Sequence, residues 1–411
     1  MEKLIINNFA GIKKLTIELN KINLILGHQA SGKSVTAKLL FYFKSFFETA
    51  KEGIIDNKTK TEIDKHYLNV FKNYFPKYTW ANSSFNIEYV NNNTYISLNY
   101  VKNKSLKIDY STNIKSLLSN ARKILKEEQS GQLSYFVSNR FSDTFNKLVE
   151  QYISTQSSFS QIFIPAGRSF FANIQTNIFT YLHNNQSLDP FLIQFGALYE
   201  KFKNIAQGAK LFSNKDADFN NLINKIIFSN YERENDIDYL IHHDKRKVEL
   251  TNASSGQQEI FPLLLILKIL KESILSDKGA VLYIEEPEAH LFPNAQKEFI
   301  KLLAHVYNSN IDKFQIIITT HSPYILSSFN NLIYAGYLSS LHKTVNQAKL
   351  FSIISRSEII DPKDIIAYSL SGKKGFKTVM DKSTHLIAQN ILDEISDEIS
   401  TEFGKLMDLE N

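Results

Sequence analysis

The first segment able to do chemistry is a glycine-rich loop at residues 27–34, which reads Gly-His-Gln-Ala-Ser-Gly-Lys-Ser. The pattern Gly-x-x-x-x-Gly-Lys-Ser lies after an apolar run and before a helical pattern, and a chance glycine turn lacks that context. Its glycines let the backbone close around phosphate oxygens, which the amides at the helix start stabilise. Lys33 would reach the β- and γ-phosphates, and Ser34 would bind Mg²⁺. We therefore predict an ATP-binding loop that uses Gly27, Ser31, Gly32, Lys33 and Ser34.

An acidic pair, Glu285-Glu286, follows the apolar run Val281–Ile284. A buried strand delivers such groups to its carboxyl end, which is where ligands bind in open α/β sheets. We predict that Glu285 holds the magnesium ion through water and that Glu286 polarises the attacking water as a general base. Taken alone, the pair is better explained as a solvated cap of the next helix. The glycine loop in the same chain favours the catalytic interpretation.

A second anion site is predicted at Ala253–Gln257, the signature segment, which opens a strongly apolar helix. The hydroxyls of Ser254 and Ser255 and the amides around Gly256 favour an anion at that helix start. Because the chain already has one phosphate loop, this segment is predicted to contact a nucleotide bound to another copy. Without that loop, Ser-Ser-Gly-Gln is more often a simple helix cap.

A histidine, His321, ends the predicted strand Gln315–Thr319 and precedes Ser322-Pro323. A lone histidine at such a place is usually a packed or capped residue. Here it follows a phosphate loop, a second anion site and an acidic pair, so we predict that it senses the γ-phosphate. The four motifs in this order predict an ATPase that works as a head-to-tail dimer with ATP and Mg²⁺.

The elements that position these motifs are predicted from hydrophobic periodicity. Strands are expected at Lys3–Ile6, Lys14–Leu19, Lys21–Leu26, Ile162–Ile164, Tyr239–Ile241, Lys247–Leu250, Ala280–Ile284, Gln315–Thr319 and Leu332–Ala335. Helices are expected at Val35–Phe47, Ile114–Ile153, Gln257–Ser273 and Ala289–Val306, with an antiparallel meander at residues 84–110. The alternation of helix and strand after residue 250 indicates an α/β sheet.

We expect four segments along the chain. Residues 1–165 form an N-terminal ATPase lobe with the glycine loop and the meander, and residues 166–250 a mainly helical insertion. Residues 251–345 form a lobe with the signature segment, the acidic pair and His321. Residues 346–411 hold a strand and an amphipathic helix that contains Asp393 and Glu394.

The composition bounds the class of protein. Hydrophobic residues make up 43% and charged residues 22% of the chain, as in a globular protein. No apolar stretch is long enough to span a bilayer and no signal-peptide pattern opens the chain, so we expect a cytoplasmic protein without membrane contact. There is no cysteine, which excludes disulfides and thiolate zinc sites. The net charge of +5 permits nucleic-acid binding without indicating it.

The motif set resembles the ABC-type ATPase superfamily. Within it, the chain is most similar to the SMC-like and OLD-like branch, which includes ATPase subunits of bacterial anti-phage systems such as Septu and PARIS. The similarity covers roughly residues 1–45 and 160–370, and its most specific string is Glu-Glu-Pro-Glu-Ala-His-Leu at residues 285–291. It implies an ATPase head with γ-phosphate contacts from Ser254 and Gly256 in trans. It also implies a dimer-crossing D-loop at Ala289–Phe292 and a switch histidine at His321.

Some positions depart from that family. The glycine loop has His28-Gln29-Ala30 where Pro-Asn-Gly is usual, and Glu285 stands where aspartate is more general. The glutamine of the Q-loop has one weak candidate, Gln161. Arg168 lies in a Pro-Ala-x-Arg element that recurs in such ATPases, with no role assigned to it.

The leading functional hypothesis is the ATPase of a bacterial defence system, a homodimer or higher homo-oligomer that controls a separate effector such as a nuclease or toxin. A second hypothesis is a repair ATPase that clamps DNA. Its phosphate contacts would be Lys102, Lys104, Lys107, Lys245, Arg246 and Lys247, although a solvated face is the favoured explanation of those charges. A third is the nucleotide-binding subunit of a transporter, which the Glu-Ala-His-Leu string disfavours. Without cysteine the chain has no zinc hook, so a chromosome-tethering role is not expected. No Asp-x-Asp follows an apolar strand, so we expect no nuclease in this chain.

Overall fold

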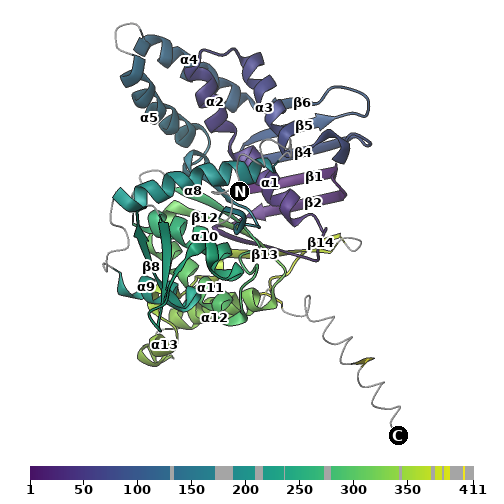
Figure 1. Ribbon diagram of the computed structural model, residues 1–411. Coiled ribbons are helices and arrows are strands. Elements are labelled where there is room, and N and C mark those ends of the chain that lie inside the picture. Colours follow the sequence, from purple (N-terminus) through teal and green to yellow (C-terminus); the bar gives the residue numbers. More distant parts are fainter. Residues whose placement is uncertain are drawn as a thin grey trace.

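A parallel sheet, here called the central sheet, organises the computed structural model of the protein (Figure 1). The residues that the structure describes are 1–129, 134–171, 188–208, 216–235, 237–272, 279–341, 345–371, 375–381, 384–388 and 401–402. The central sheet has the order β14-β13-β3-β12-β11-β7. Its strands are β3 (Ile22–Leu26), β7 (Ser160–Ile164), β11 (Ala280–Glu285), β12 (Phe314–Thr320), β13 (Ile365–Ser371) and β14 (Gly375–Thr378).

All strands of the central sheet except β14 run parallel, so their carboxyl ends share one edge. Side chains along each strand alternate between two cores, as the two-residue period of a strand requires. On β11, for example, Leu282 and Ile284 enter one core while Val281 and Tyr283 enter the other. Each fully buried aliphatic side chain of this kind contributes roughly 1.5–3 kcal/mol. Burial on both faces explains why these strands are continuous apolar runs.

One core lies under the N-terminal lobe, which consists of an antiparallel sheet and helices α2 to α5. The antiparallel sheet has the order β2-β1-β4-β5-β6 and comprises β1 (Glu2–Phe9), β2 (Ile12–Leu19), β4 (Phe85–Asn91), β5 (Thr94–Tyr100) and β6 (Lys107–Tyr110). Helix α1 (Lys33–Lys44) packs between this sheet and the central sheet. The other helices are α2 (Phe46–Ile55), α3 (Lys60–Tyr74), α4 (Thr112–Gln129) and α5 (Ser134–Tyr152).

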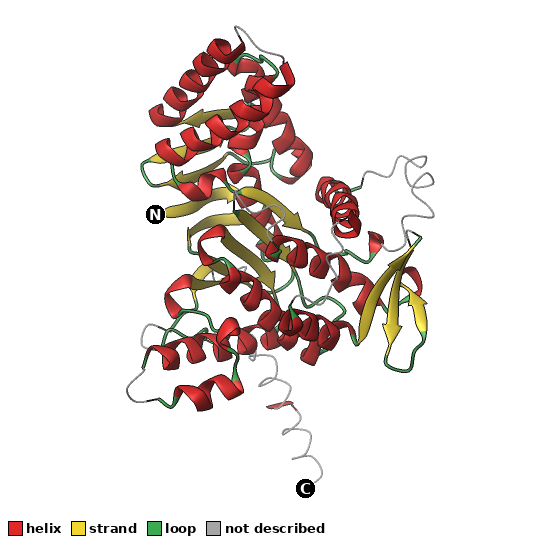
Figure 2. Cartoon of the chain, turned by 90° about the vertical axis from the view of Figure 1, so that its left-hand side faces the viewer, coloured by secondary structure: helices red, strands yellow, loops and turns green. Residues whose placement is uncertain are grey.

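The other core is covered by helices that follow β7 in the chain. These are α8 (Pro190–Gly208), α9 (Ala217–Ile227), α10 (Ser255–Lys271), α11 (Pro293–Ser309) and α12 (Pro323–Ser340). A further helix, α13 (Gln347–Ile353), contacts α12. A small antiparallel sheet of β8 (Ser229–Glu234), β9 (Ile237–His242) and β10 (Lys247–Glu249) stands at the periphery in Figure 2. Within the described residues, no helix has the length and apolar character needed to cross a membrane.

The α/β class, the parallel glycine-loop sheet and the antiparallel meander are confirmed. The predicted strand Leu332–Ala335 is wrong, because these residues belong to α12. Leu332 and Ile333 are buried together with Ile325 and Phe329, which is the spacing of one helix face. The predicted helix at Ala289 begins only at Pro293, after a turn. The predicted amphipathic helix around Asp393 lies outside the described residues, and the division into four segments stays a prediction.

Candidate functional site

Four loops with chemistry-bearing residues meet at the carboxyl edge of the central sheet. The glycine loop leaves β3, the acidic pair ends β11, His321 follows β12, and Arg168 follows β7. The strand register brings them level, since Thr320 pairs with Leu26 and Glu285 pairs with Thr319. The structure therefore places the predicted glycine loop, acidic pair and switch histidine at one edge, as expected for an α/β sheet.

The glycine loop is shaped by its two glycines. A Cβ on Gly27 would lie 2.3 Å from the carbonyl oxygen of Leu370, and Gly32 has a φ of 97° where α1 begins. The buried Lys33 donates through Nζ to the carbonyls of Gly27 (2.7 Å) and His28 (2.9 Å). No acidic residue lies in the first turn of α1, so the helix start favours an anion.

The pKa of the Lys33 ammonium is lowered, because burial outweighs the effect of nearby carboxylates. Burial lowers the pKa of its ammonium, while the nearby carboxylates of Glu286 and Glu288 act in the opposite direction. A buried hydroxyl oxygen, Ser31 Oγ, has no hydrogen-bond partner among the described residues. A cation and an unpaired hydroxyl inside a loop of backbone amides fit a bound phosphate group.

Glu285 is the buried member of the acidic pair. Burial raises the pKa of its carboxyl group, and the nearby ammonium of Lys38 acts against that rise, as do the Ser34 hydroxyl and the Ala166 amide. Its Oε1 is buried without a hydrogen-bond partner in the described part of the chain. A carboxylate oxygen left open beside a serine hydroxyl is the donor set that Mg²⁺ prefers, so these residues fit the ion.

Glu286, Glu288 and His321 form the second part of the site. Nδ1 of His321 lies 3.7 Å from Oε1 of Glu286 and 3.6 Å from Oε1 of Glu288. Glu288 is buried and accepts from the Thr320 hydroxyl (2.7 Å) and the His321 amide (2.9 Å). Glu286 is partly exposed, with 31% of its side chain accessible. Glu288 thus ties the acidic loop to the end of β12, and Glu286 faces the open side.

Glu288 belongs to the Glu-Glu-Pro-Glu-Ala-His-Leu string, and its role is not predicted from the sequence. Its partners, Thr320 and His321, lie more than thirty positions away in the chain and meet it only through the parallel pairing of β11 and β12. The signal in the sequence is the motif position: Glu288 is separated from the acidic pair only by Pro287, so it lies at the same sheet edge.

The signature segment, Ala253–Gln257, forms the start of α10 and belongs to none of the four loops described above. Ser254 caps the helix in a capping box with Gln257, and both Ser254 and Ser255 are exposed. Gln257 also donates to the carbonyl of Ile227 at 2.7 Å. A Cβ on Gly256 would lie 2.6 Å from the carbonyl oxygen of His290, so this glycine allows α10 to approach the predicted D-loop of its own chain.

The Q-loop candidate Gln161 is wrong. It lies near the start of β7, where it pairs with Val281, and its side chain accepts from the Tyr283 hydroxyl at 2.7 Å. The start of a parallel strand is the edge opposite the glycine loop. Gln161 therefore serves the packing of β7 on β11.

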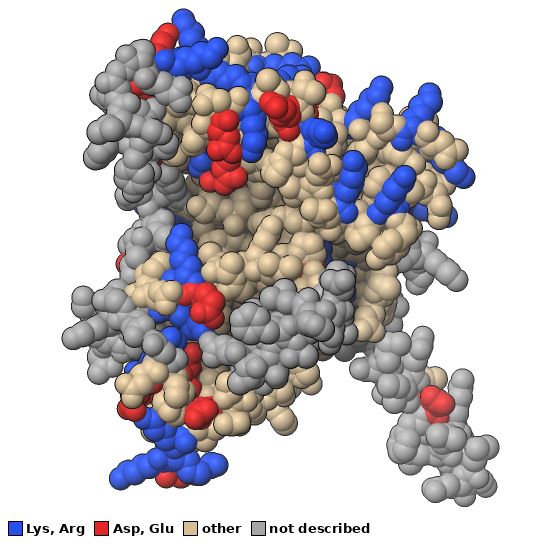
Figure 3. All heavy atoms as spheres, turned by 45° about the horizontal axis from the view of Figure 1, so that its top comes forward, with Lys and Arg blue, Asp and Glu red and all other residues tan. Residues whose placement is uncertain are grey.

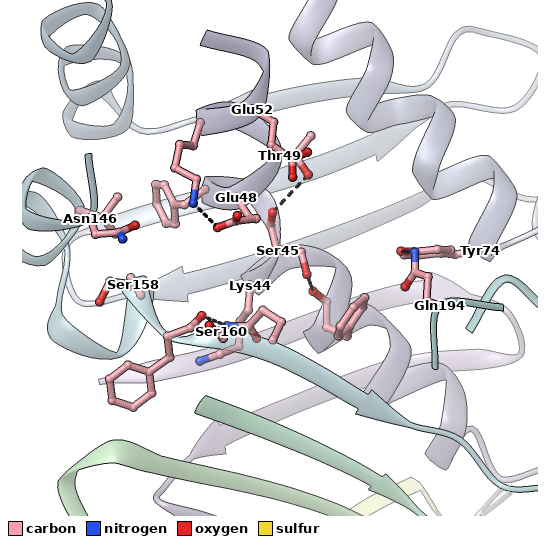
Figure 4. A pocket seen from close by; sticks show the side chains of 17 residues that line it. Lys44, Ser45, Glu48, Thr49, Glu52, Tyr74, Asn146, Ser158, Ser160 and Gln194 are labelled. Atoms are coloured by element: carbon pink, nitrogen blue, oxygen red, sulfur yellow. Dashed lines mark hydrogen bonds and ion pairs between the residues drawn. The ribbon is translucent and has the colours of Figure 1, made fainter. Parts of the chain in front are cut away.

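A cavity of about 460 Å³ lies away from the site, around the far end of α1 (Figure 4). Lys44, Ser45, Glu48 and Tyr74 are among its lining residues, and the glycine loop contributes none. At 1.5 Å per residue, Lys44 is about 16 Å along α1 from Lys33. The cavity is thus separate from the predicted phosphate loop.

Comparison with known proteins gives a family. No curated protein matches. Among solved structures, the chain is similar to an SMC head domain from Thermotoga maritima (13% identity, 79% of this chain and 90% of that chain, TM-score 0.36). It is also similar to the Smc head domain with an extended coiled coil, bound to the C-terminal domain of ScpA, from Pyrococcus furiosus (13% identity, 97% and 100%, TM-score 0.41). The profile of the AAA ATPase domain matches residues 1–326, and the chain therefore belongs to this family of ATPase domains.

Proposed function

We propose that the chain is the ATP-binding and ATP-hydrolysing subunit of a bacterial anti-phage defence system. It acts in the cytoplasm, dimerises through composite ATP sites and controls a separate effector protein. One observation carries the ATPase part of the proposal: the glycine loop, the open oxygen of Glu285 and the Glu286–His321 pair lie at one sheet edge. Membership of an ATPase-domain family supports it.

Nucleotide binding in this proposal rests on the glycine loop. The backbone of Gly27, Ser31 and Gly32 surrounds the phosphates, and Lys33 exchanges its carbonyl partners for phosphate oxygens. Ser34 and Glu285 would hold Mg²⁺ beside them. The ion neutralises charge on the phosphates when it is bound.

Hydrolysis requires a base and a group that detects the γ-phosphate. Glu286 is the partly exposed carboxylate of the site, and it accepts a proton from the attacking water. His321 lies beside it and contacts the γ-phosphate. Glu288 orients the His321 backbone through its buried hydrogen bond, so the base and the sensor share one scaffold.

The dimer follows from the signature segment. Ser254, Ser255 and the backbone of Gly256 are accessible at the start of α10, with a helix N-terminus behind them. In the proposed head-to-tail dimer, these groups contact the γ-phosphate of the nucleotide on the partner. Each site then consists of the glycine loop of one copy and the signature segment of the other.

Lys33→Ala tests the ATP site. The substitution removes the cation beside the β- and γ-phosphates, so a calorimetric titration should show loss of ATP binding. Lys51→Ala in α2, whose ammonium pairs with Glu48 at 2.7 Å, is the matched control and should still bind. Binding of ATP by Lys33→Ala at full strength would contradict the glycine-loop assignment.

The defence role is supported by the Glu-Glu-Pro-Glu-Ala-His-Leu string and is tested in cells. A host that carries the gene with its native neighbours should resist phage, and the Lys33→Ala variant should lose that resistance. Unchanged plaque formation with the intact locus would contradict the defence role while leaving the ATPase proposal standing.

A DNA-clamping ATPase is the second candidate, and a basic groove favours it. The groove, about 550 Å³ in volume, lies on the N-terminal lobe between α3 and α4, and Figure 3 shows Lys and Arg side chains gathered over this lobe. Its cationic lining residues are Lys60, Lys115, Arg122, Lys123 and Lys126. Three groove lysines have acidic partners of their own: Lys60 with Asp64, Lys115 with Asp109 and Lys123 with Glu127. Of the basic residues predicted from sequence, Arg246 and Lys247 likewise pair with Asp244 and Glu234.

The salt dependence of duplex binding shows whether the groove binds DNA or is only a solvated basic surface. If the groove neutralises DNA phosphates, a labelled duplex should bind with a steep dependence on salt, and Lys123→Gln with Lys126→Gln should reduce the slope by about 0.9 per lost contact. Lys247→Gln on the peripheral sheet is the control and should leave the slope unchanged. Absence of duplex binding at low salt would remove the DNA candidate.

A further inference from the structure

Arg168 is fully buried at the carboxyl edge of the central sheet, and its guanidinium contacts two separate loops and a helix. Nη1 donates to the carbonyl oxygens of Pro165 (3.0 Å) and Glu285 (2.9 Å), and Nη2 donates to that of Glu286 (3.3 Å). Nε donates to the carbonyl oxygen of Glu259 on α10 (3.0 Å), and Nη2 lies 3.2 Å from the Glu259 carboxylate. One side chain thus joins the backbone of the acidic pair to the signature helix.

The Glu259 carboxylate is fixed by backbone amides of the loop that carries Arg168. Its carboxylate accepts from three successive amides, those of Gly167 (3.0 Å), Arg168 (2.9 Å) and Ser169 (2.7 Å). Gly167 has a φ of 78°, the left-handed backbone that lets the loop wrap around the carboxylate. Glu259 itself is fully buried. Every strong partner of this anion therefore comes from the loop that carries Arg168.

A buried ion pair with this many hydrogen bonds stays together when its surroundings move. Separating the two charges would leave each one unpaired in the interior, which is far more costly than shifting both together. Guanidinium geometry is also required, because five donors in a rigid fork reach carbonyls on several sides and an ammonium does not. The loop of Arg168, the start of α10 and the acidic pair accordingly form one unit.

The position of this unit in the proposed dimer has a consequence. Glu259 lies about one helical turn after Ser254–Gly256, which contact the nucleotide on the partner. Glu286, whose carbonyl oxygen Arg168 holds, acts on the nucleotide in its own chain. We propose, on the basis of the function proposed above, that Arg168 is a positioning residue that couples the two composite ATP sites. Engagement of the signature segment at one site sets the general base at the other.

Steady-state kinetics of the full chain test the coupling. The wild type should hydrolyse ATP with a Hill coefficient above one. Arg168→Lys and Glu259→Gln should bind ATP within about threefold of the wild type, lose at least tenfold in kcat and show a Hill coefficient of about one. The double variant should lose no more than the worse single variant, because the two residues act as a unit.

Glu2→Gln is the matched control. Glu2 is another buried carboxylate paired with a cation, Lys44, but its partner Gln315 lies at the start of β12, on the opposite edge of the sheet. The same carboxylate-to-amide change there should lower the melting temperature and leave kcat and the Hill coefficient unaltered. This control distinguishes loss of coupling from loss of stability.

The outcomes separate this inference from the function on which it rests. A wild type that neither binds nor hydrolyses ATP overturns the proposed function. A wild type that hydrolyses ATP with a Hill coefficient of one overturns the coupling alone, as do Arg168→Lys and Glu259→Gln variants that keep the wild-type coefficient. If Arg168→Lys does not fold, Glu259→Gln and the wild type still decide the matter.

Discussion

Glu286 combines a strained backbone with an accessible carboxylate. Its φ is 42°, in the left-handed region that costs a non-glycine residue roughly 1–2 kcal/mol. Three hydrogen bonds hold that conformation. The Glu286 amide donates to the carbonyl of Thr319 (2.9 Å), and the Glu286 carbonyl accepts from the Ala289 amide (3.0 Å) and from Arg168 (3.3 Å). Strain maintained in this way clusters at functional sites. The adjacent Glu285 is buried instead, so neighbouring residues of one type have different environments and different proposed tasks.

Glu286→Gln should keep ATP bound and stop turnover. The amide has the shape of the carboxylate but cannot accept the proton of the attacking water, so kcat should fall by a factor of about 10²–10⁴. Calorimetry with ATP and a phosphate-release assay measure the two effects separately. The exposed Glu48→Gln on α2 controls for the loss of one negative charge. Turnover at the wild-type rate in Glu286→Gln would leave Glu286 as no more than a turn residue.

At the scale of elements, the start of α10 has both a structural and a proposed binding task. The capping box of Ser254 and Gln257 satisfies the helix amides, while the serine side chains face solvent. Helix α3 has the same device, a capping box of Thr59 and Glu62. The described residues therefore include two exposed hydroxyl caps of one kind, at Thr59 and Ser254, and of these two Ser254 belongs to the signature segment.

Ser254→Arg should block ATP-dependent association and turnover but leave nucleotide binding at Lys33 largely intact. The long side chain obstructs the facing γ-phosphate, and loss of the cap costs about 1 kcal/mol of stability. Thr59→Arg is the matched control, since it removes an equivalent cap at a similar cost without affecting association. Sedimentation with ATP in a Glu286→Gln background measures association. Equal behaviour of the two variants would show that Ser254 is only a cap.

Helices α1 and α3 are joined by two buried tyrosines. The Tyr42 hydroxyl donates to the carbonyl of Tyr67 (3.0 Å), the Tyr67 hydroxyl donates to that of Tyr42 (2.9 Å), and their rings stack at 4.2 Å. Burial raises the pKa of both phenols well above 10. Below pH 10 the folded and unfolded chains both keep these protons. Above it, only the unfolded chain releases them, so the stability is lost as pH rises.

Unfolding in urea at a series of alkaline pH values should detect this effect. The free energy of unfolding should fall above about pH 10 by roughly 1.4 kcal/mol per pH unit for each tyrosine that the fold keeps protonated. Tyr42→Phe should reduce that slope by roughly 1.4 kcal/mol per pH unit, the contribution of one tyrosine. A slope identical to that of the wild type would mean that the Tyr42 phenol ionises in the folded chain.

Local patterns predicted the strands and loops of the site well, because a continuous apolar run followed by a polar motif fixes both the element and its end. Short apolar runs were ambiguous: Leu332–Ala335 suits a strand or a buried helix face, and only packing on the central sheet decides for α12. The partners of Arg168 were beyond local pattern. Glu259 is about ninety positions away in the chain. The sequence around a glutamate inside an apolar helix does not indicate which distant residue pairs with it.

At the scale of the molecule, each proposed site takes its parts from two chains. The glycine loop leaves β3 at the edge of the central sheet, while the signature segment is an exposed helix start whose hydrogen bonds go to Gln257 and Ile227. In a symmetric pair, each copy gives its glycine loop to one site and its signature segment to the other. Lesions in the two segments should therefore complement each other between copies, whereas in a monomeric enzyme they would not.

Mixing Ser254→Arg with Lys33→Ala tests this arrangement. Each variant alone is expected to be inactive, since both of its sites carry a lesion. In a mixed dimer one site carries both lesions and the other carries neither. Half of the dimers in an equal mixture are mixed and each has one intact site of two, so independent sites would restore about a quarter of the wild-type activity.

The link through Arg168 lowers that value, because the base at the intact site belongs to the chain whose signature segment faces an empty site. Recovery between zero and a quarter supports both the dimer and the coupling, and a full quarter supports the dimer alone. A mixture with no activity, together with a Glu286→Gln variant that stays monomeric with ATP, would contradict the composite site.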